Sequence, residues 1–220
     1  MNPLTVLQDS LYFFRSHLGS ILVLCLPLVV LEALAKQALS HAMAADASPA
    51  YELVVSLFFY PLYTGALILF LDARSRGEEP QPRDLLAMAV RMWPAFALLS
   101  AMSTLLILFG LSLFAVPGIW VMVKLAFAEY LLVLRKLTPF MAMRESMQMT
   151  NGHFVRILTC LLCIYIPLTL LEALSLYLFP EPQGAPLALA LSSIGSFLQL
   201  FTSVVMFRLF MLISEPQRQD

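Results

Sequence analysis

Six apolar stretches, each about as long as a membrane-spanning helix, constrain this chain more than any other feature of its sequence. Crossing the ~30 Å hydrocarbon layer takes ~20 consecutive apolar residues in a helix. A helix satisfies its own backbone groups within lipid, whereas a membrane β-barrel would show ~10-residue segments of alternating polarity. The sequence therefore predicts six spanning helices, at residues 20–39, 53–71, 95–115, 119–134, 157–179 and 187–213.

The composition supports the same class of protein. Hydrophobic residues make up 60% of the 220 residues and charged residues 12%, against about 45–50% and about 25% in soluble domains. The net charge of −1 gives no case for nucleic acid as a partner, because nucleic-acid binding calls for a clustered basic face. We expect one all-α integral membrane domain over residues 1–220, a six-helix bundle.

The basic residues predict the orientation of this bundle. Of the 13 Lys and Arg residues, eleven lie in segments 72–94 and 135–156 or near the two ends of the chain, and none lies in the intervening loops 40–52, 116–118 and 180–186. Short loops rich in Lys and Arg stay in the cytoplasm. The sequence thus predicts a multi-pass membrane protein with both termini in the cytoplasm.

The first span has the alternative interpretation of a signal peptide. Ala33-Leu34-Ala35 resembles a cleavage site, but Glu32 and Lys36 flank it, and the preceding segment carries Asp9 rather than a short basic tail. We therefore expect an uncleaved helix.

A short amphipathic segment precedes each pair of spans, at residues 4–16, 83–93 and 139–151. Apolar residues recur in them at the i, i+3, i+4, i+7 spacing of a helix that lies in the membrane interface. Thr138-Pro139 is a typical helix start and Gly152 a typical stop. We expect the basic side chains of these regions to face lipid headgroups: Arg15, Arg83, Arg91, Arg144 and Arg156.

Two octets suggest an internal repeat. PLVVLEAL at residues 27–34 and PLTLLEAL at 167–174 share six of eight letters, and His17 and His153 open the two spans alike. With the amphipathic segments, this indicates three units of one surface helix and two spans. Such units keep one orientation and are parallel repeats. Chance likeness between Leu-rich helices is the alternative.

Five charged residues lie inside predicted spans: Glu32, Lys36, Lys124, Glu129 and Glu172. A charge at the bilayer centre costs about 2.5–3.5 kcal/mol on insertion scales, so it usually faces a partner or a wet cavity. Lys36 follows Glu32 by four residues and can pair with it locally. We expect the other charges to form an intramembrane polar cluster of Glu32, Lys124, Glu129 and Glu172, with a Lys124–Glu172 contact. Snorkelling or neutral side chains without function are the alternative.

Pro27 and Pro167 each precede one of these carboxylates by five residues. A proline inside a helix frees a carbonyl group and bends the axis. The sequence thus predicts a helix kink at each, either as part of a site or as a packing device only.

No catalytic residue, metal site or cofactor site is predicted. Walker, GxGxxG, HExxH and GxSxG motifs are absent from the sequence. Cys25, Cys160 and Cys163 lie in apolar runs, which favours packing over redox or metal chemistry.

Several segments together resemble one family. VPGI at residues 116–119, MAMRESMQMT at 141–150, FRLFMLI at 207–213 and DSLYFFR at 9–15 are similar to the YciC-type family of multi-pass inner-membrane proteins of Gram-negative bacteria. More remotely, the layout resembles the membrane domain of some glycerophosphodiester phosphodiesterases. The resemblance implies a fold and an inner-membrane location, and it implies no reaction, cofactor or catalytic residue.

Two functions from different classes follow from these patterns. The first is a non-enzymatic envelope protein with membrane lipids as partners, and with other inner-membrane proteins and homo-oligomerisation left open. The alternative is a small transporter or permease-like protein whose intramembrane Glu and Lys residues line a polar cavity.

Overall fold

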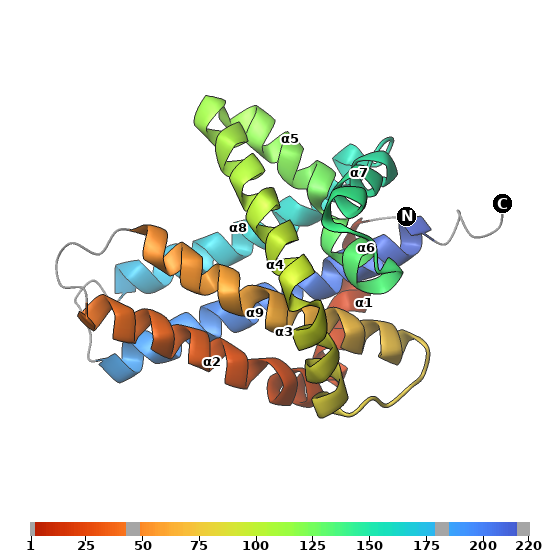
Figure 1. Cartoon of the computed structure of the whole chain (residues 1–220). Coiled ribbons are helices and arrows are strands. Elements are labelled where there is room, and N and C mark those ends of the chain that lie inside the picture. Colours follow the sequence, from red (N-terminus) through yellow and green to blue (C-terminus); the bar gives the residue numbers. More distant parts are fainter. Residues whose placement is uncertain (1–2, 43–48, 179–184, 215–220) are drawn as a thin grey trace.

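All the elements that the structure describes are helices. The computed structural model describes residues 3–42, 49–178 and 185–214 (Figure 1). In chain order the helices are α1 (Pro3–Ser16), α2 (Leu18–Ala42), α3 (Pro49–Ser75), α4 (Pro82–Leu113), α5 (Ala115–Leu125), α6 (Ala128–Arg135), α7 (Pro139–Met149), α8 (Phe154–Leu178) and α9 (Ala185–Ser214).

Four described segments are long and apolar enough to cross a membrane, and they confirm the first four predicted spans. They are Leu18–Leu39, Tyr51–Ser75, Pro82–Leu113 and Ala115–Arg135. A fifth is obtained when α7 and α8, which are bent by 105° relative to each other, are taken as one broken span. The predicted sixth span falls partly outside the described side chains, and its described part, Gln199–Ser214, is apolar but shorter than a span. The chain therefore contains four to five spanning helices in its described part.

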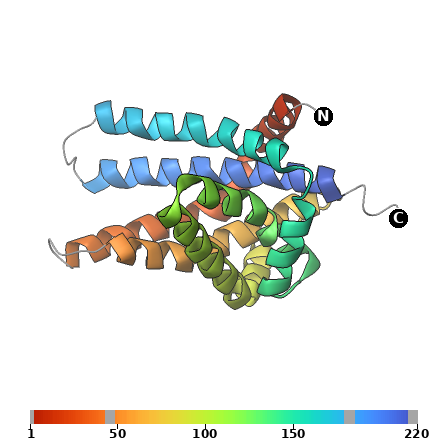
Figure 2. The same cartoon turned by 90° about the horizontal axis from the view of Figure 1, so that it is seen from above.

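The arrangement differs from a simple bundle. Helices α2, α3, α8 and α9 run alongside one another (Figures 1 and 2), whereas the hairpin of α4 and α5 crosses them steeply in Figure 1. The expectation of six similarly oriented helices in one bundle is thus not confirmed.

Two of the three predicted surface helices are separate elements. α1 precedes α2, and α7 precedes α8 at 105°, as a helix lying across the end of a span requires. Pro139 is the first residue of α7, and the turn after α7 contains Gly152 with a positive φ of 80°. The predicted starting and stopping signals are therefore confirmed for α7.

The prediction of a third separate surface helix at residues 83–93 is wrong. These residues form the first third of α4, which continues through Pro94 without a break. A proline inside a helix removes one hydrogen bond and bends the axis, but it need not end the helix. Trp93 also fastens this point to α3, because its Nε1 donates a 2.9 Å hydrogen bond to the Phe58 carbonyl and its ring lies 5.0 Å from the Phe58 ring.

The α4–α5 hairpin turns where two glycines meet. A Cβ atom on Gly110 would lie 2.9 Å from the Cα of Gly118, and a Cβ on Gly118 would lie 2.4 Å from Cδ2 of Leu111. Small residues let two membrane helices approach closely. Phe114, between the helices, has extended backbone with φ −163° and ψ 158° and ends α4. The VPGI motif thus supplies the glycine of this close contact.

The interior lies among α2, α3, α6 and α9, where side chains such as Leu67, Leu131 and Leu209 are fully buried. The end of the α4–α5 hairpin is the opposite case. Phe114 and Val116 are 76% and 77% exposed there. Such a contiguous exposed apolar surface is expected for helices that face hydrocarbon rather than water.

Candidate functional site

Two polar stripes of neighbouring helices face a common cavity. Tyr60, Tyr63 and Thr64 lie on one face of α3, and Gln199, Thr202 and Ser203 lie on one face of α9 with the same i, i+3, i+4 spacing. With Tyr165 of α8 and Leu200 they line a cavity of about 110 Å³, called the polar cavity below. A polar lining of this kind is unusual between apolar helices, where a polar group without a partner is costly.

Two of the hydroxyl groups that line the polar cavity have no partner. Thr64 is completely buried, and its Oγ1 forms no hydrogen bond in the described part of the chain. Thr202 Oγ1 is likewise buried and unpaired there. An unsatisfied buried hydroxyl costs about 1–3 kcal/mol. The polar cavity is therefore suited to a polar occupant.

Glu129 lies behind the tyrosines of the polar cavity. The Tyr60 hydroxyl lies 3.0 Å from both carboxylate oxygens of Glu129 and donates its hydrogen to this carboxylate. The carboxylate also interacts electrostatically with the hydroxyl groups of Tyr63 and Tyr165. No described basic side chain forms an ion pair with Glu129. An acidic side chain therefore lies behind the described lining of the polar cavity, beyond Tyr60.

Glu32 forms the local ion pair that the sequence predicts. It is buried, and one carboxylate oxygen lies 2.8 Å from Lys36 Nζ, one helical turn away. Glu32 also interacts electrostatically with Tyr63, whose ring packs edge-on against Tyr60 at 5.7 Å. Tyr60 and Tyr63 thus connect Glu32 and Glu129, two members of the predicted polar cluster.

Lys124 lies at a different place. Its Nζ donates a 2.6 Å hydrogen bond to Asn151 Oδ1, just beyond α7, and lies 5.6 Å from the centre of the Trp120 ring. The predicted partner Glu172 is in α8, but its side chain lies outside the described residues. The Lys124–Glu172 contact therefore stays a prediction.

The Ser146 side chain forms hydrogen bonds to the backbone at the break between α5 and α6. The sequence alone did not indicate this role. Its hydroxyl donates a 2.8 Å hydrogen bond to the Lys124 carbonyl and accepts a 3.2 Å hydrogen bond from the Phe127 amide. Ser146 is fully buried. It supplies partners for backbone groups that the interrupted helix cannot pair.

A second cavity lies where the basic segment between α3 and α4 meets the start of α2. It has a volume of about 440 Å³ and is called the basic-loop cavity below. Gly19 is one of the lining residues, and a Cβ atom placed on it would have no other atom within 4 Å. Arg74 is the basic side chain that lines it. Its Nη1 donates a 2.9 Å hydrogen bond to the exposed Glu79, while its Nε is buried and unpaired among the described residues.

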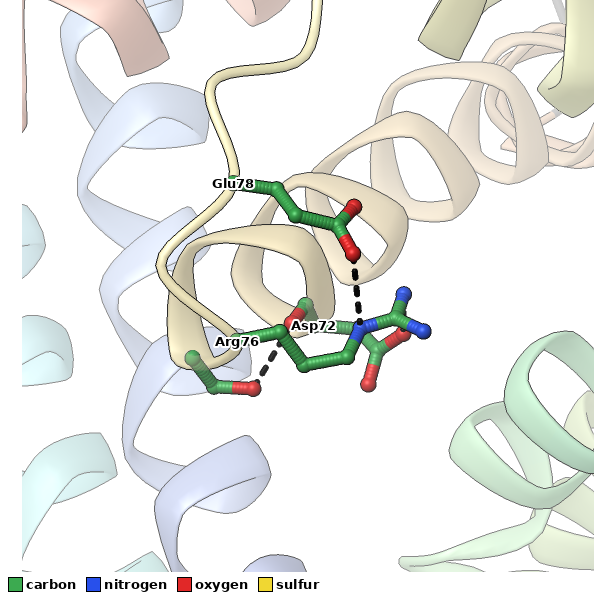
Figure 3. A network of polar contacts seen from close by, with 4 residues as sticks. Asp72, Arg76 and Glu78 are labelled. Atoms are coloured by element: carbon green, nitrogen blue, oxygen red, sulfur yellow. Dashed lines mark hydrogen bonds and ion pairs between the residues drawn. The ribbon is translucent and has the colours of Figure 1, made fainter.

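The neighbouring Arg76 forms ion pairs with two carboxylates, those of Asp72 and Glu78 (Figure 3). Its Nη2 lies 2.5 Å from Asp72 Oδ2, and its Nε lies 3.8 Å from Glu78 Oε1. Arg76 is therefore neutralised by two carboxylates and is a matched comparison for Arg74.

The remaining predicted site residues lie inside helices or at exposed positions, and the helix kinks at Pro27 and Pro167 stay a prediction. Pro27 lies inside α2 and Pro167 inside α8. The five arginines expected at lipid headgroups are all exposed: Arg15, Arg83, Arg91, Arg144 and Arg156. Their contact with headgroups stays a prediction.

Sequence reasoning missed the residues that line both cavities. Of the predicted cluster residues with described side chains, Glu32, Lys124 and Glu129, none lines the polar cavity itself. The usable signal was the i, i+3, i+4 spacing of polar residues in apolar runs, at Tyr60, Tyr63 and Thr64 and again at Gln199, Thr202 and Ser203. Arg74 carried no comparable signal, because segment 72–94 contains four arginines.

The known proteins to which this chain is similar are membrane proteins. Proteins named UPF0259 membrane protein, from Yersinia pestis (strain Pestoides F) and Yersinia pseudotuberculosis serotype O:3 (strain YPIII), are 29% identical to this chain over 155 residues. The match covers 69% of this chain and 59% of each relative. No family model matches the chain, and no solved structure matches it.

The names of these relatives mention neither YciC nor a phosphodiesterase, and they describe a location without an activity. Together with the apolar helices, the similarity to these uncharacterised bacterial proteins identifies the chain as a multi-pass membrane protein.

Proposed function

We infer that this chain is a non-enzymatic inner-membrane protein of the bacterial envelope that binds anionic lipid headgroups at its cytoplasmic face. The basic segments 72–94 and 135–156 support this orientation, since Lys-rich and Arg-rich short loops remain in the cytoplasm. The exposed arginines of α4, α7 and α8, Arg83, Arg91, Arg144 and Arg156, lie in these segments. Each basic residue near an anionic surface contributes about 1 kcal/mol to binding.

One observation carries this proposal: the Arg74 guanidinium lines a 440 Å³ cavity and has an unpaired Nε. A guanidinium binds phosphate oxygens through parallel N–H donors. Its present partner Glu79 is 84% exposed, and exposed ion pairs are worth only about 0–1 kcal/mol. A phosphate group could therefore replace Glu79 at little cost.

Native mass spectrometry of the full chain with added phosphatidylglycerol tests the proposal. Arg74→Gln removes the charge at the basic-loop cavity, so we expect binding of phosphatidylglycerol to weaken about fivefold, the equivalent of about 1 kcal/mol. Arg76→Gln is the matched control, because Asp72 and Glu78 already engage this arginine. It should bind like the unmodified chain.

Two results would contradict lipid binding at this cavity. One is equal weakening by Arg74→Gln and Arg76→Gln, which would show a general charge effect. The other is equal retention of phosphatidylcholine and phosphatidylglycerol by the unmodified chain, which would show no preference for anionic headgroups.

The finer architecture belongs to the same proposal. We propose one domain over residues 1–220 with six crossings, both termini in the cytoplasm, and three parallel repeats. The repeat is supported by the equivalent turns at His17 and His153, whose carbonyls accept 3.0 Å hydrogen bonds from the amides of Ile21 and Ile157. The resemblance to YciC-type proteins is consistent with this layout, and other inner-membrane proteins or a second copy remain proposed partners.

A small transporter is the second candidate function, and the polar cavity favours it. A polar cavity among membrane helices is a feature of substrate pathways. This candidate predicts that proteoliposomes with the unmodified chain pass a small polar solute faster than protein-free vesicles do. Thr64→Leu, which places a bulkier apolar side chain at the polar cavity, should abolish the difference.

A further inference from the structure

The polar cavity has the size and the lining of a binding site for a small polar ligand. Its volume of about 110 Å³ equals the liquid volume of about three or four water molecules, at ~30 Å³ each. Thr64 Oγ1 and Thr202 Oγ1 are both buried and unpaired in the described chain. Two unpaired hydroxyls on opposite helices, α3 and α9, call for an occupant that can bond to both.

The carboxylate of Glu129 behind the polar cavity favours a positively charged occupant over a neutral one. Glu129 has Tyr60 as its hydrogen-bond donor, and no described basic side chain forms an ion pair with it. The two lysines inside the predicted spans are engaged elsewhere, Lys36 with Glu32 and Lys124 with Asn151. Water would satisfy the threonine hydroxyls, but it would supply no counter-ion for the ionised form of Glu129. A cation satisfies both.

The hydrogen-bond directions favour a cation that carries N–H groups. Because the Tyr60 hydroxyl donates its hydrogen to Glu129, its oxygen is free to accept a hydrogen bond from the cavity side. The hydroxyl groups of Thr64 and Thr202 can accept as well. The rings of Tyr60, Tyr63 and Tyr165 line the same space, and aromatic faces attract ammonium groups.

A hard metal ion fits this lining less well. Such ions take six or more oxygen ligands, with carboxylates prominent among them. No carboxylate is among the described residues that line the polar cavity, and the described part of the chain contains no group of three His, Cys, Asp or Glu residues that could hold a metal. The lining is that of a site for an organic or inorganic ammonium.

We propose that the polar cavity binds a small ammonium-type cation, ammonium itself or methylammonium. Its N–H groups donate to the Thr64 and Thr202 hydroxyls and to the Tyr60 oxygen. The carboxylate of Glu129, on the other side of the Tyr60 hydroxyl, balances its charge. This proposal goes beyond lipid binding and does not depend on it, since no residue lines both cavities.

Thermal unfolding of the purified full chain in detergent tests this assignment. Ammonium chloride or methylammonium chloride should raise the unfolding midpoint saturably, because a ligand that binds only the folded state stabilises it. Sodium chloride at equal ionic strength should not. Equilibrium dialysis with labelled methylammonium gives a direct second measurement of binding.

Variants distinguish a specific effect on methylammonium binding from a general effect on the stability of the fold. Glu129→Gln keeps an oxygen for Tyr60 to donate to but removes the charge, so methylammonium binding should weaken at least tenfold. The double variant Thr64→Val, Thr202→Val preserves shape while removing both hydroxyls, and it should also bind more weakly. Glu52→Gln is the control, because this glutamate lies exposed in the first turn of α3, and its binding should be unchanged.

Three outcomes would overturn the proposal. They are an equal response to sodium and methylammonium, the absence of saturable methylammonium binding to the unmodified chain, and binding by Glu129→Gln that equals that of Glu52→Gln. If Glu129→Gln fails to fold, the double threonine variant decides the matter, because undiminished dialysis binding by that variant contradicts the assignment. Failure of the Arg74 lipid experiment would leave all these outcomes unaffected.

Discussion

At the residue scale, polar side chains stabilise the places where the apolar helices are interrupted. Ser146 illustrates this, because its single hydroxyl serves the Lys124 carbonyl and the Phe127 amide on the two sides of the α5–α6 break. Without water, each of these backbone groups would otherwise remain unpaired. The serine of the MAMRESMQMT segment thus has a structural role in joining α7 to the α5–α6 span.

We predict that Ser146→Ala destabilises the fold. The change leaves a buried backbone amide and a buried carbonyl without this partner, at a cost of about 1–3 kcal/mol in the free energy of unfolding. Unfolding in mixed detergent micelles, followed by circular dichroism, measures this change. Ser112→Ala is the matched control, because the Ser112 hydroxyl is exposed and bonds only to the Phe109 carbonyl of its own helix.

The Ser112→Ala change should alter the free energy of unfolding by less than about 0.5 kcal/mol. Equal losses in the two variants would contradict the role assigned to Ser146, since they would reflect the loss of any serine hydroxyl.

Local pairs were predictable from sequence, and distant ones were not. The Glu32–Lys36 ion pair follows from the four-residue spacing on a helix, and it is present. Tyr60 and Glu129 are 69 positions apart, and Lys124 and Asn151 are 27 apart. Such partners depend on how helices pack and turn, which hydrophobic periodicity does not specify.

At the element scale, the apolar runs predicted the spanning helices because bilayer thickness sets their length. The four described spans within α2, α3, α4 and α5–α6 agree with the sequence. The boundary at Pro94 was wrong, because proline was read as the end of a surface helix, whereas Trp93 is hydrogen-bonded to α3 and the helix continues. The steep crossing of the α4–α5 hairpin (Figure 1) likewise had no signal in the pattern of apolar residues.

The close approach of α4 and α5 gives a sharp prediction at Gly118. A Cβ there would lie 2.4 Å from Leu111 Cδ2 and 2.9 Å from the Leu111 backbone nitrogen. Because the backbone atom cannot rotate away, Gly118→Ala must separate the two helices, and overpacking of this kind costs about 1–3 kcal/mol. The unfolding midpoint in detergent should fall accordingly.

Gly195→Ala in α9 is the matched control, since no atom lies within 4 Å of the added Cβ. Alanine has the higher helix propensity, so this change should be neutral or slightly stabilising. If Gly118→Ala proves as harmless as Gly195→Ala, the packing of the hairpin described above is incorrect.

At the scale of the whole molecule, the basic residues are concentrated in alternate loops of the chain. The loops between spans alternate between segments that contain four basic residues, 72–94 and 135–156, and segments that contain none. The basic-loop cavity lies at the first of the basic segments, and the polar cavity lies among α3, α8 and α9. The proposed lipid site and the proposed ammonium site therefore occupy separate regions of one membrane domain.

The positions of the spans and the charges of the loops were easier to predict from the sequence than either cavity was. Span positions and the charge of the loops depend on composition over about 20 residues, which one sequence displays directly. A cavity depends on which faces of distant helices meet, as Thr64 and Thr202 do. The proposed three-unit repeat is an intermediate case, since α1 and α7 are separate helices as it predicts, whereas residues 83–93 are part of α4.

The most direct measurement of the central claim is the location of two loops relative to the membrane. Alkaline phosphatase, active only in the periplasm, and green fluorescent protein, fluorescent only in the cytoplasm, are each fused after Ala47 and after Gly77. With α3 crossing the membrane and its basic end inside, the fusion at Ala47 should show phosphatase activity and the fusion at Gly77 should fluoresce. If both positions report the same compartment, α3 does not cross, and the proposed topology is contradicted.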